Sequence, residues 1–403
     1  MENDKTLDNR QGNANHDIMR KTNVLKLLNC IRESGPLTKR EIQTQTGLSW
    51  GAIWNISSEL INKEILKEAK VGKTTTGRTP VALDINGVSH FFIGIDMIED
   101  KVMTVIIDMK CQVLSQRKYA CTDFRRESIL SLIKNIIKEL LECPSASGGT
   151  FIGIGISMQG AVDNFKGVSC FHPVYEDWEN VALKNILEES FELPVIVMHD
   201  PDCMALAEKW FGHAHSAKNY LFIRFDDSMG IGIGMSIIIN GEVYSGSHGF
   251  TGELGHIIIN FDESKEFYDK KGMLGMYSTI SGIQKTLSDA LPNYNLSFTE
   301  AACHARLGES PYYEVFQVAG KALGCAIASL ANILNPEMVI LGGNFMDYSD
   351  VFWDTMTEYI HKNIWKFTDV DVRISEVVNG AAIGAAVAVL QQLYNGEIPS
   401  TFT

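Results

Sequence analysis

The sequence predicts an α/β protein in which an N-terminal winged helix-turn-helix precedes a two-lobed α/β domain. Near the N-terminus a short helix, a glycine and a longer helix occur in that order, and a basic hairpin follows. The rest of the chain runs twice through a meander of strands and then alternating strands and helices. Charge is also divided, because residues 1–80 hold 13 basic and 9 acidic residues while the remainder holds 22 and 40. We expect a polar tail at 1–17, a DNA-binding domain at 18–86 and the two-lobed domain at 87–403.

The composition indicates a folded protein in a reducing compartment. Of the 403 residues, 45% are hydrophobic and 21% are charged, which suffices for more than one core. No apolar run approaches the roughly 20 residues that span a membrane, and the polar N-terminus lacks a secretory signal. The 8 cysteines are scattered without a CxxC pair, as is typical of reduced thiols. We therefore expect a cytoplasmic protein with no membrane partner.

Three helices are predicted in the N-terminal domain. Their ranges are 18–33, 39–46 and about 50–64. Thr38 and Glu41 form a capping box for the second helix, Gly47 supplies a turn, and Ser49 can cap the third helix. A short helix, a turn and a longer helix are the arrangement of a helix-turn-helix.

The third helix and the hairpin after it carry the candidate DNA contacts. The exposed side of that helix would show Trp50, Asn55 and Ser58, and asparagine can pair with adenine. The alternative is a plain three-helix bundle with a tryptophan in its core. Strands at 65–66 and 81–85 flank a basic segment that contains Lys73 and Arg78. Arg78 could enter a minor groove, as in a winged helix, or the segment could be an ordinary solvated turn.

The large domain shows two successive rounds of strands and helices. The first round predicts strands at 91–97, 102–107, 113–118, 151–157 and 195–198, with helices at about 126–142, 181–191 and 202–211. The second predicts strands at 220–225, 231–239, 242–244, 255–260 and 338–341, with helices at about 278–290, 311–334, 351–363 and 380–394. This repetition indicates a duplicated fold with a cleft between its lobes.

Several motifs, taken in order, resemble the ROK family of repressors, open reading frames and kinases. They are TGRTP in the hairpin, IGIGISMQGAVD at 152–163, the pair His199–Asp200 followed by ALAEKWFG, GELGH at 252–256, NPEMVILGG at 335–343 and GAAIGAA at 380–386. The resemblance covers residues 20–395, and the winged helix makes the chain similar to the xylose-repressor-like branch. It implies an actin/hexokinase-like ATPase (ribonuclease H-like) fold, a sugar site in the cleft, and a homodimer or dimer of dimers.

The phosphate-binding turns of the family's kinases are altered in this chain. Kinases of the family carry a DxGGT turn, and here the aligned stretch is Asp96–Asp100, with Ile98 and Glu99 at the glycine positions. The segment similar to GTGIGGG is Ser228–Gly234, which lacks the threonine and two of the glycines. Phosphoryl transfer needs close backbone approach to the phosphates. We therefore expect no kinase activity and no ATP cofactor.

The zinc site that the resemblance implies is also altered. His256 matches the family's histidine, but the aligned cysteine positions hold Glu266, Tyr268 and Met273. A structural zinc site needs four ligands, so we expect no metal. The glutamate that contacts the sugar in the family corresponds to Gly275.

Four polar residues remain as candidate ligands of a sugar effector, through charge-assisted hydrogen bonds: His199, Asp200, Glu253 and His256. Asp200 follows a strand and precedes a helix, where ligands of α/β folds collect. The competing interpretation is a helix-capping aspartate before Pro201. His199 belongs to a residue type that titrates near neutrality. Tyr175 and Trp178 either approach the sugar or anchor their loop.

The sequence therefore predicts a DNA-binding transcriptional regulator, a repressor of sugar-metabolism genes, with a double-stranded DNA operator and a sugar or sugar derivative as partners. One alternative is a ROK-type sugar kinase that phosphorylates a hexose with ATP. Another is a ligand-free protein that keeps the fold for dimerisation. The effector, the operator and the direction of the response stay open at this stage.

Overall fold

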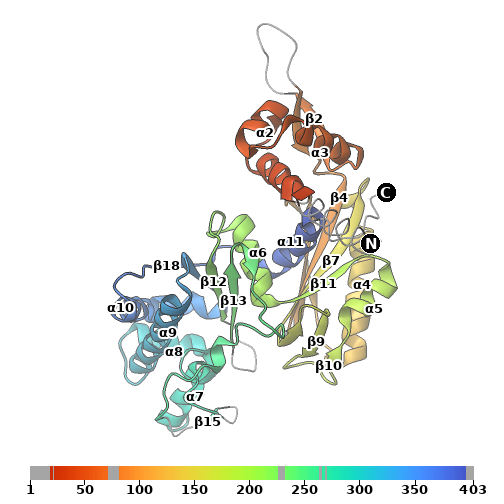
Figure 1. The fold of residues 1–403 in the computed structure, drawn as a ribbon. Helices are drawn as coiled ribbons and strands as arrows, with labels where there is room; N and C mark the ends of the chain where they lie inside the picture. The colour runs from red at the N-terminus through yellow and green to blue at the C-terminus, as the bar shows by residue number, and fades with distance from the viewer. Residues whose placement is uncertain are drawn as a thin grey trace, which may run out of the picture.

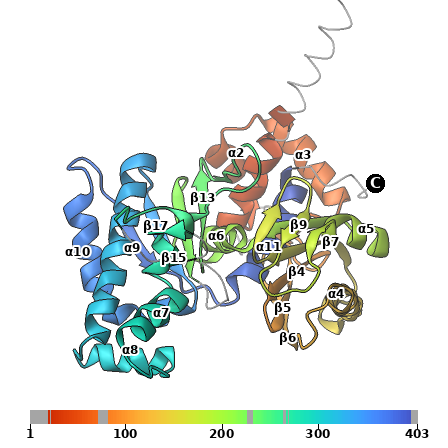
Figure 2. The ribbon, with the colours of Figure 1, turned by 90° about the horizontal axis from the view of Figure 1, so that it is seen from below.

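A computed structural model describes residues 19–20, 22–70, 81–225, 232–262, 266–267 and 270–395. In this part of the chain an N-terminal head of small helices and a three-stranded sheet stands on a larger two-lobed body (Figure 1). The helices α6 (Asp200–Phe211) and α11 (Gly380–Asn395) lie between the sheets of the two lobes (Figure 2). The predicted fold class, a winged helix followed by a two-lobed actin-like domain, is confirmed.

The head contains helices and strands in the order typical of a winged helix-turn-helix. Its elements are a helix at residues 22–34, β1 (Leu37–Thr38), α2 (Lys39–Thr46), α3 (Trp50–Asn62), β2 (Leu66–Lys70) and β3 (Val81–Ile85). The strands form an antiparallel sheet in the order β1-β3-β2. Leu28, Ile42 and Ile53 are buried between the helices, so each helix contributes one apolar face to the core.

Local sequence signals place the two helices of the turn. Thr38 accepts a hydrogen bond from the Glu41 amide, and the Glu41 carboxylate accepts one from the Thr38 amide at 2.7 Å. Gly47 ends α2 with a φ of 69°, a left-handed conformation that glycine adopts without strain. Ser49 then caps α3 through the Ala52 amide at 3.2 Å. The predicted capping box, turn and second cap are all confirmed.

The first lobe is built on a five-stranded sheet with the order β11-β7-β4-β5-β6. Its strands are β4 (His90–Ile98), β5 (Lys101–Asp108), β6 (Val113–Ala120), β7 (Thr150–Met158) and β11 (Val195–His199). The first three are antiparallel, and β7 and β11 add in parallel on the other side of β4. The lobe is completed by α4 (Arg126–Leu141), η1 (Pro144–Ala146), α5 (Leu183–Phe191) and a small sheet of β8 (Ala161–Asp163), β9 (Val168–Phe171) and β10 (Glu179–Val181).

The second lobe repeats the same sheet topology, with the order β14-β13-β12-β17-β18. Its strands are β12 (Tyr220–Phe225), β13 (Ile233–Ile239), β14 (Glu242–Val243), β17 (Met338–Gly342) and β18 (Asp371–Ile374). The other elements are η2 (Leu254–His256), β15 (Glu266–Phe267), β16 (Lys270–Lys271), η3 (Leu274–Met276), α7 (Ile280–Ala290), α8 (Phe298–Arg306), α9 (Tyr312–Leu334), η4 (Asn344–Val351) and α10 (Trp353–Asn363). The predicted duplication is therefore present in the strand order itself.

The helices α6 and α11 cross so closely that their backbones touch. A Cβ atom at Gly384 would lie 1.6 Å from the Cys203 carbonyl oxygen. Cβ atoms at Gly94 and Gly155 would lie 1.9 Å from carbonyl oxygens of α11. Only glycine permits such an approach. The three glycines thus join α6, α11 and the first-lobe sheet into one tightly packed unit.

Some elements differ from the predicted ones. The predicted strand at 255–260 is the turn η2 followed by irregular chain, because its backbone bonds to a neighbouring loop, as in Ile259 N–H to Gly272 O at 2.8 Å. The predicted helix at 351–363 is present as α10, which begins at Trp353 after the separate turn η4, and α3 ends at Asn62 rather than at residue 64. α8 and β18 were not predicted, although Ser297 and Glu300 form a capping box at the start of α8.

One described helix, α9, is long and apolar enough to cross a membrane by length and composition, contrary to the expectation that no run approaches that length. Half of its most apolar stretch is buried inside the protein. Residues such as Phe316, Leu323 and Ile327 join the apolar core of the second lobe. This burial is what the central helix of a folded lobe requires, and it explains the apolar composition.

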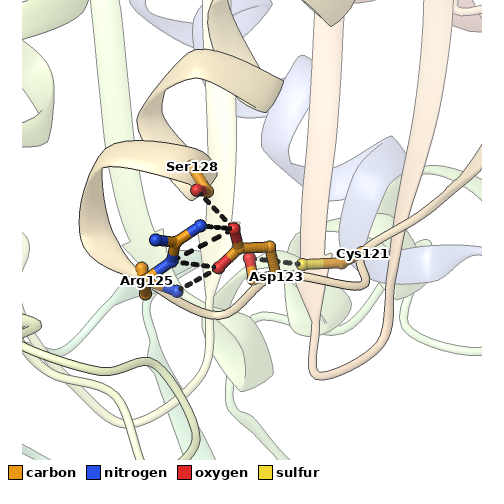
Figure 3. Close-up of polar contacts among 4 residues, drawn as sticks. All are labelled: Cys121, Asp123, Arg125 and Ser128. Carbon is orange, nitrogen blue, oxygen red and sulfur yellow. Dashed lines mark hydrogen bonds and ion pairs between the residues drawn. The ribbon is translucent and has the colours of Figure 1, made fainter.

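The loop before α4 is organised by the side chain of Asp123 (Figure 3). Its carboxylate accepts hydrogen bonds from the Arg125 amide at 3.1 Å and from Ser128 Oγ at 2.8 Å, and it pairs with the Arg125 guanidinium. The Arg125 and Ser128 bonds hold the pKa of the Asp123 carboxyl well below its usual range. The N-cap residue of α4, Arg125, makes no side-chain cap, and Asp123 fixes the approach to the helix through the Arg125 amide and the Ser128 hydroxyl.

Candidate functional site

The first turn of α6 carries Asp200 into the space between the two lobes. β11 leads directly into α6, and the Asp200 side chain is only 4% exposed. One carboxylate oxygen pairs with Arg224 Nη1, from β12 of the second lobe, and the other lies 3.3 Å from His199 Nε2. The N-cap of α6 is His199 rather than Asp200. The carboxylate is thus engaged in an ion pair between the lobes, and the helix-capping interpretation is wrong.

His199 is a neutral imidazole at pH 7. Burial, together with the positive charge of Arg224, lowers the pKa of His199 to about 4. The expectation of titration near neutrality is therefore wrong, because the site is too dry to accept a second cation beside the guanidinium. A neutral ring can donate through one nitrogen to Asp200 and accept through the other.

Asp202 is a second buried carboxylate in the first turn of α6, and it forms hydrogen bonds with both lobes. It accepts hydrogen bonds from Ser236 Oγ of β13 at 2.6 Å and from Asn164 Nδ2 of the first lobe at 2.9 Å. The Asn164 side-chain oxygen in turn accepts the His199 amide at 3.1 Å. Burial raises the pKa of Asp202 to about 6, against the opposing effect of these bonds.

Glu253 and His256 form a more open pair beside this network. Their side chains are 50% and 38% exposed, and His256 Nε2 lies 3.8 Å from the Glu253 carboxylate. His256 Nδ1 also lies 3.5 Å from Lys270 Nζ. Partial burial raises the pKa of Glu253, and burial with the Lys270 charge lowers the pKa of His256. Both shifts favour the uncharged form of the side chain.

The strand β13 links the two pairs of candidate residues. Gly234 is the register partner of Arg224, and a Cβ atom on it would lie 2.9 Å from Pro201 and 3.5 Å from His199. The next residue, Met235, donates its amide to Gly252 O at 2.8 Å, directly before Glu253. Among the described residues, no ion pair or hydrogen bond joins Glu253 or His256 to Asp200. The four candidates thus form two separate pairs, and each pair adjoins a segment that contacts β13.

Tyr175 and Trp178 are loop anchors. They are 5% and 2% exposed. Trp178 Nε1 donates to Ser169 Oγ at 2.8 Å, and the Tyr175 ring stacks on His172 with centroids 3.6 Å apart. Rings that are fully covered in this way have no free face for a sugar.

The side of α3 opposite its buried face presents aromatic and polar groups to solvent. Trp50 and Trp54 are 49% and 54% exposed, and Lys39 of α2 lies over the Trp54 ring at 3.7 Å. Asn55 is exposed, and Ser58 is half-buried. The alternative with a tryptophan in the core of the head is therefore wrong. The wing residues Lys73 and Arg78 lie outside the described residues.

The segments aligned with phosphate and zinc sites are only partly described. β4 and β5 pair as far as Ile98 and Lys101, so Glu99 and Asp100 form a tight two-residue turn, and Asp96 before it is buried against Ser157 Oγ at 2.8 Å. The second segment and Tyr268 fall largely outside the described residues. In the part that is described, no three His, Cys, Asp or Glu side chains are grouped to hold a metal. An imidazole beside an ammonium group, with methionine, tyrosine and glutamate at the cysteine positions, does not fit structural zinc.

Sequence reasoning missed three residues of the site, namely Arg224, Asp202 and Asn164. Arg224 left a signal, because it is the single charge in the apolar strand YLFIRF, and a buried charge requires a partner. No sequence signal marked Asp202 or Asn164, because polar residues are common at the start of a helix and in a loop.

Comparisons with known proteins assign both parts of the chain. The ROK family model matches residues 92–392, and a winged helix-turn-helix DNA-binding model matches residues 20–67. A putative xylose repressor of Caldicellulosiruptor sp. (strain Rt8B.4) is 27% identical over 94% of this chain and 97% of its own. The DNA-binding transcriptional dual regulator NagC of Escherichia coli (strain K12) is 24% identical over 95% and 96%. The crystal structure of a ROK family transcriptional regulator, a homologue of the E. coli MLC protein, superposes with a TM-score of 0.83 at 24% identity over 95% and 99%.

Proposed function

The chain belongs to the ROK family, and on that premise we propose that it is a sugar-responsive transcriptional repressor without kinase activity. Its α3 and the wing residues Lys73 and Arg78 bind an operator, and its interlobe cleft binds the effector. It works in the cytoplasm as a homodimer or dimer of dimers, so that two heads reach half-sites about one helical turn apart or a multiple of that.

The buried ion pair of Asp200 with Arg224 carries the proposal. In a kinase of this fold the residue at Asp200 would take the proton of the sugar hydroxyl. A carboxylate already paired with a guanidinium is a poor base, because accepting a proton would leave Arg224 buried without its counter-ion. The same carboxylate can still accept hydrogen bonds from hydroxyl groups. The cleft is therefore suited to bind a polyol and unsuited to phosphorylate it.

The effector is a sugar or sugar derivative held by His199, Asp200, Glu253 and His256. The exposed pair Glu253–His256 lies at the solvent side, and Asp200 with His199 lies deeper. The names of two relatives, a putative xylose repressor and an N-acetylglucosamine repressor, support a carbohydrate ligand. A thermal-shift screen with xylose, glucose and N-acetylglucosamine, free and phosphorylated, should identify one compound that raises the melting temperature, since a ligand specific to the native state stabilises it.

Substitution in the cleft should then weaken that ligand. Asp200→Asn should cost about 1.5–3 kcal/mol of effector affinity, the range for hydrogen bonds to charged groups, as measured by calorimetry. Arg306→Gln, in an exposed pair of the second lobe, is the matched control and should leave affinity unchanged. Wild-type affinity in both Asp200→Asn and Glu253→Gln would place the effector elsewhere.

DNA binding is tested with duplexes that the protein itself enriches from a random library. Removing residues 1–86 should abolish the gel shift. Asn55→Ala should cost about 1–3 kcal/mol and relax the preference at one base pair, and Arg78→Ala should weaken binding most on A/T-rich sites. An undiminished shift from the truncated protein would refute the assignment. Sugar-dependent ATP consumption in a coupled assay would instead favour the kinase alternative.

A further inference from the structure

The head rests on the end of α6 that is farthest from the cleft. Arg32, on the helix at residues 22–34, places its guanidinium carbon 4.2 Å from the centre of the Trp210 ring, in the last turn of α6. Tyr394 of α11 packs against the same ring, with centroids 6.3 Å apart. Leu28 of the head and Leu206 of α6 belong to one continuous apolar core. The DNA-binding head is thus seated directly on the helix whose first residue is Asp200.

α6 forms an unbroken connection between the cleft and this contact. Asp200 and Trp210 are separated by about 15 Å along the axis, at 1.5 Å per residue. Cys203, Leu206 and Trp210 recur at helical spacing and therefore lie on one face. The close crossing at Gly384 means that α6 cannot shift without displacing α11. We therefore expect α6 to move as a rigid helix, so that a displacement of its first turn also displaces Trp210.

The remaining attachments hold the opposite side of the head. The Glu64 carbonyl of the head accepts a hydrogen bond from Ser89 Oγ of the two-lobed domain at 2.8 Å. Lys110 Nζ lies 2.7 Å from the Asp84 carboxylate. These bonds fix the sheet side of the head next to the chain connection. The contact between Arg32 and Trp210 fixes the helical side, and the two together set how the head is oriented.

We propose that Arg32 and Trp210 are positioning residues that transmit the state of the cleft to the DNA-binding head through α6. The proposal rests on the proposed function of the cleft as an effector site. A ligand that competes for the Asp200 carboxylate changes its pairing with Arg224 and shifts the first turn of α6. Trp210 moves with the helix, and the head follows because a guanidinium is held over a ring face only in a narrow range of positions.

Hydrogen exchange on the full chain tests this connection without DNA or ligand. Arg224→Met disturbs the cleft end of α6, and Leu287→Ala, in α7 of the second lobe, is the control for general destabilisation. Amides of residues 26–34 should exchange at least threefold faster in Arg224→Met than in Leu287→Ala at matched stability. The excess should vanish when both are made in a Trp210→Ala background. Equal rates, or an excess that survives Trp210→Ala, would overturn the proposal. Arg224→Lys replaces Arg224→Met if the latter does not fold.

A second measurement isolates the planar contact from the charge. Arg32→Lys keeps the charge but loses the flat stacking surface, so affinity for a library-selected duplex should change about threefold. Arg20→Lys, in an exposed pair with Glu59 of the same head, should leave it unchanged. Equal affinities in wild type and Arg32→Lys would count against the proposal. If the wild type bound no DNA, the proposed function would fail, while the exchange result would still decide for or against the connection.

Discussion

Removing one partner of the Asp200–Arg224 pair should destabilise the protein far more than removing both. The two side chains are 4% and 12% exposed, so solvent screens them little. Charges about 4 Å apart attract by about 4 kcal/mol at an effective dielectric of 20, and removing one member of a buried pair costs about 3–5 kcal/mol. We therefore expect Arg224→Met to lower the free energy of unfolding by that amount. The double variant Asp200→Asn/Arg224→Met should lie within about 2 kcal/mol of wild type, because neither change then leaves a buried charge alone.

Urea unfolding followed by tryptophan fluorescence, at pH 7 and at two salt concentrations, would measure these differences. The wild-type contribution of the pair should be insensitive to salt, since buried pairs are screened weakly. Arg306→Met is the matched control, because its pair with Asp350 is 36% and 57% exposed and should contribute less than about 1 kcal/mol. Equal losses in the single and the double variant would show that the two charges do not depend on each other, and the reasoning would be wrong.

Three further outcomes follow from the packing and charge around α6 and on α3. Because the pKa of Asp202 is about 6 in the folded chain and lower when unfolded, stability should fall by about 2 kcal/mol as pH rises from 4 to 7; Asp202→Asn should flatten this part of a stability–pH profile, and an unchanged profile would contradict the assignment. Gly384→Ala should lower the free energy of unfolding by about 1–3 kcal/mol. Gly380→Ala is the control and should be neutral or stabilising, because a Cβ atom there would lie 3.7 Å from its nearest neighbour, an ordinary contact distance. Similar urea midpoints for both variants would refute the tight crossing. Trp54→Ala should reduce operator affinity at least tenfold in a gel shift without changing the melting temperature, because the ring is exposed; a large drop in melting temperature would mean that Trp54 supports the head instead.

The order of helices and strands was predicted well because it depends on local sequence patterns. Capping residues, a glycine turn and strand alternation act over a few neighbouring residues, and so Thr38, Gly47 and Ser49 marked the head correctly. The segment at 255–260 was misassigned for the opposite reason. Its residues have strand-like composition, but it pairs with the neighbouring loop only through the single bridge of Ile258 with Met273, which is too short to form a strand.

The candidate site was predictable in part. His199 and Asp200 were identified by motif, and the structure places them together. Their chemistry was not predictable, because it depends on Arg224, which is remote in sequence and arrives from the other lobe. The same holds for the pKa of His199, which burial and a neighbouring cation set. The motifs thus identified which residues belong to the candidate site, while the protonation and pairing of their side chains depend on the fold.

The placement of α11 has a consequence for how the protein is made. Tyr394 donates to Met109 O at 3.1 Å across 285 residues of sequence, and α11 packs in the same core as Leu28 of the head and Phe92 of β4. The head therefore emerges from the ribosome before the α11 surface that supports it. Contacts so distant in sequence form slowly. A nascent or C-terminally truncated chain that lacks α11 would carry a head without this support.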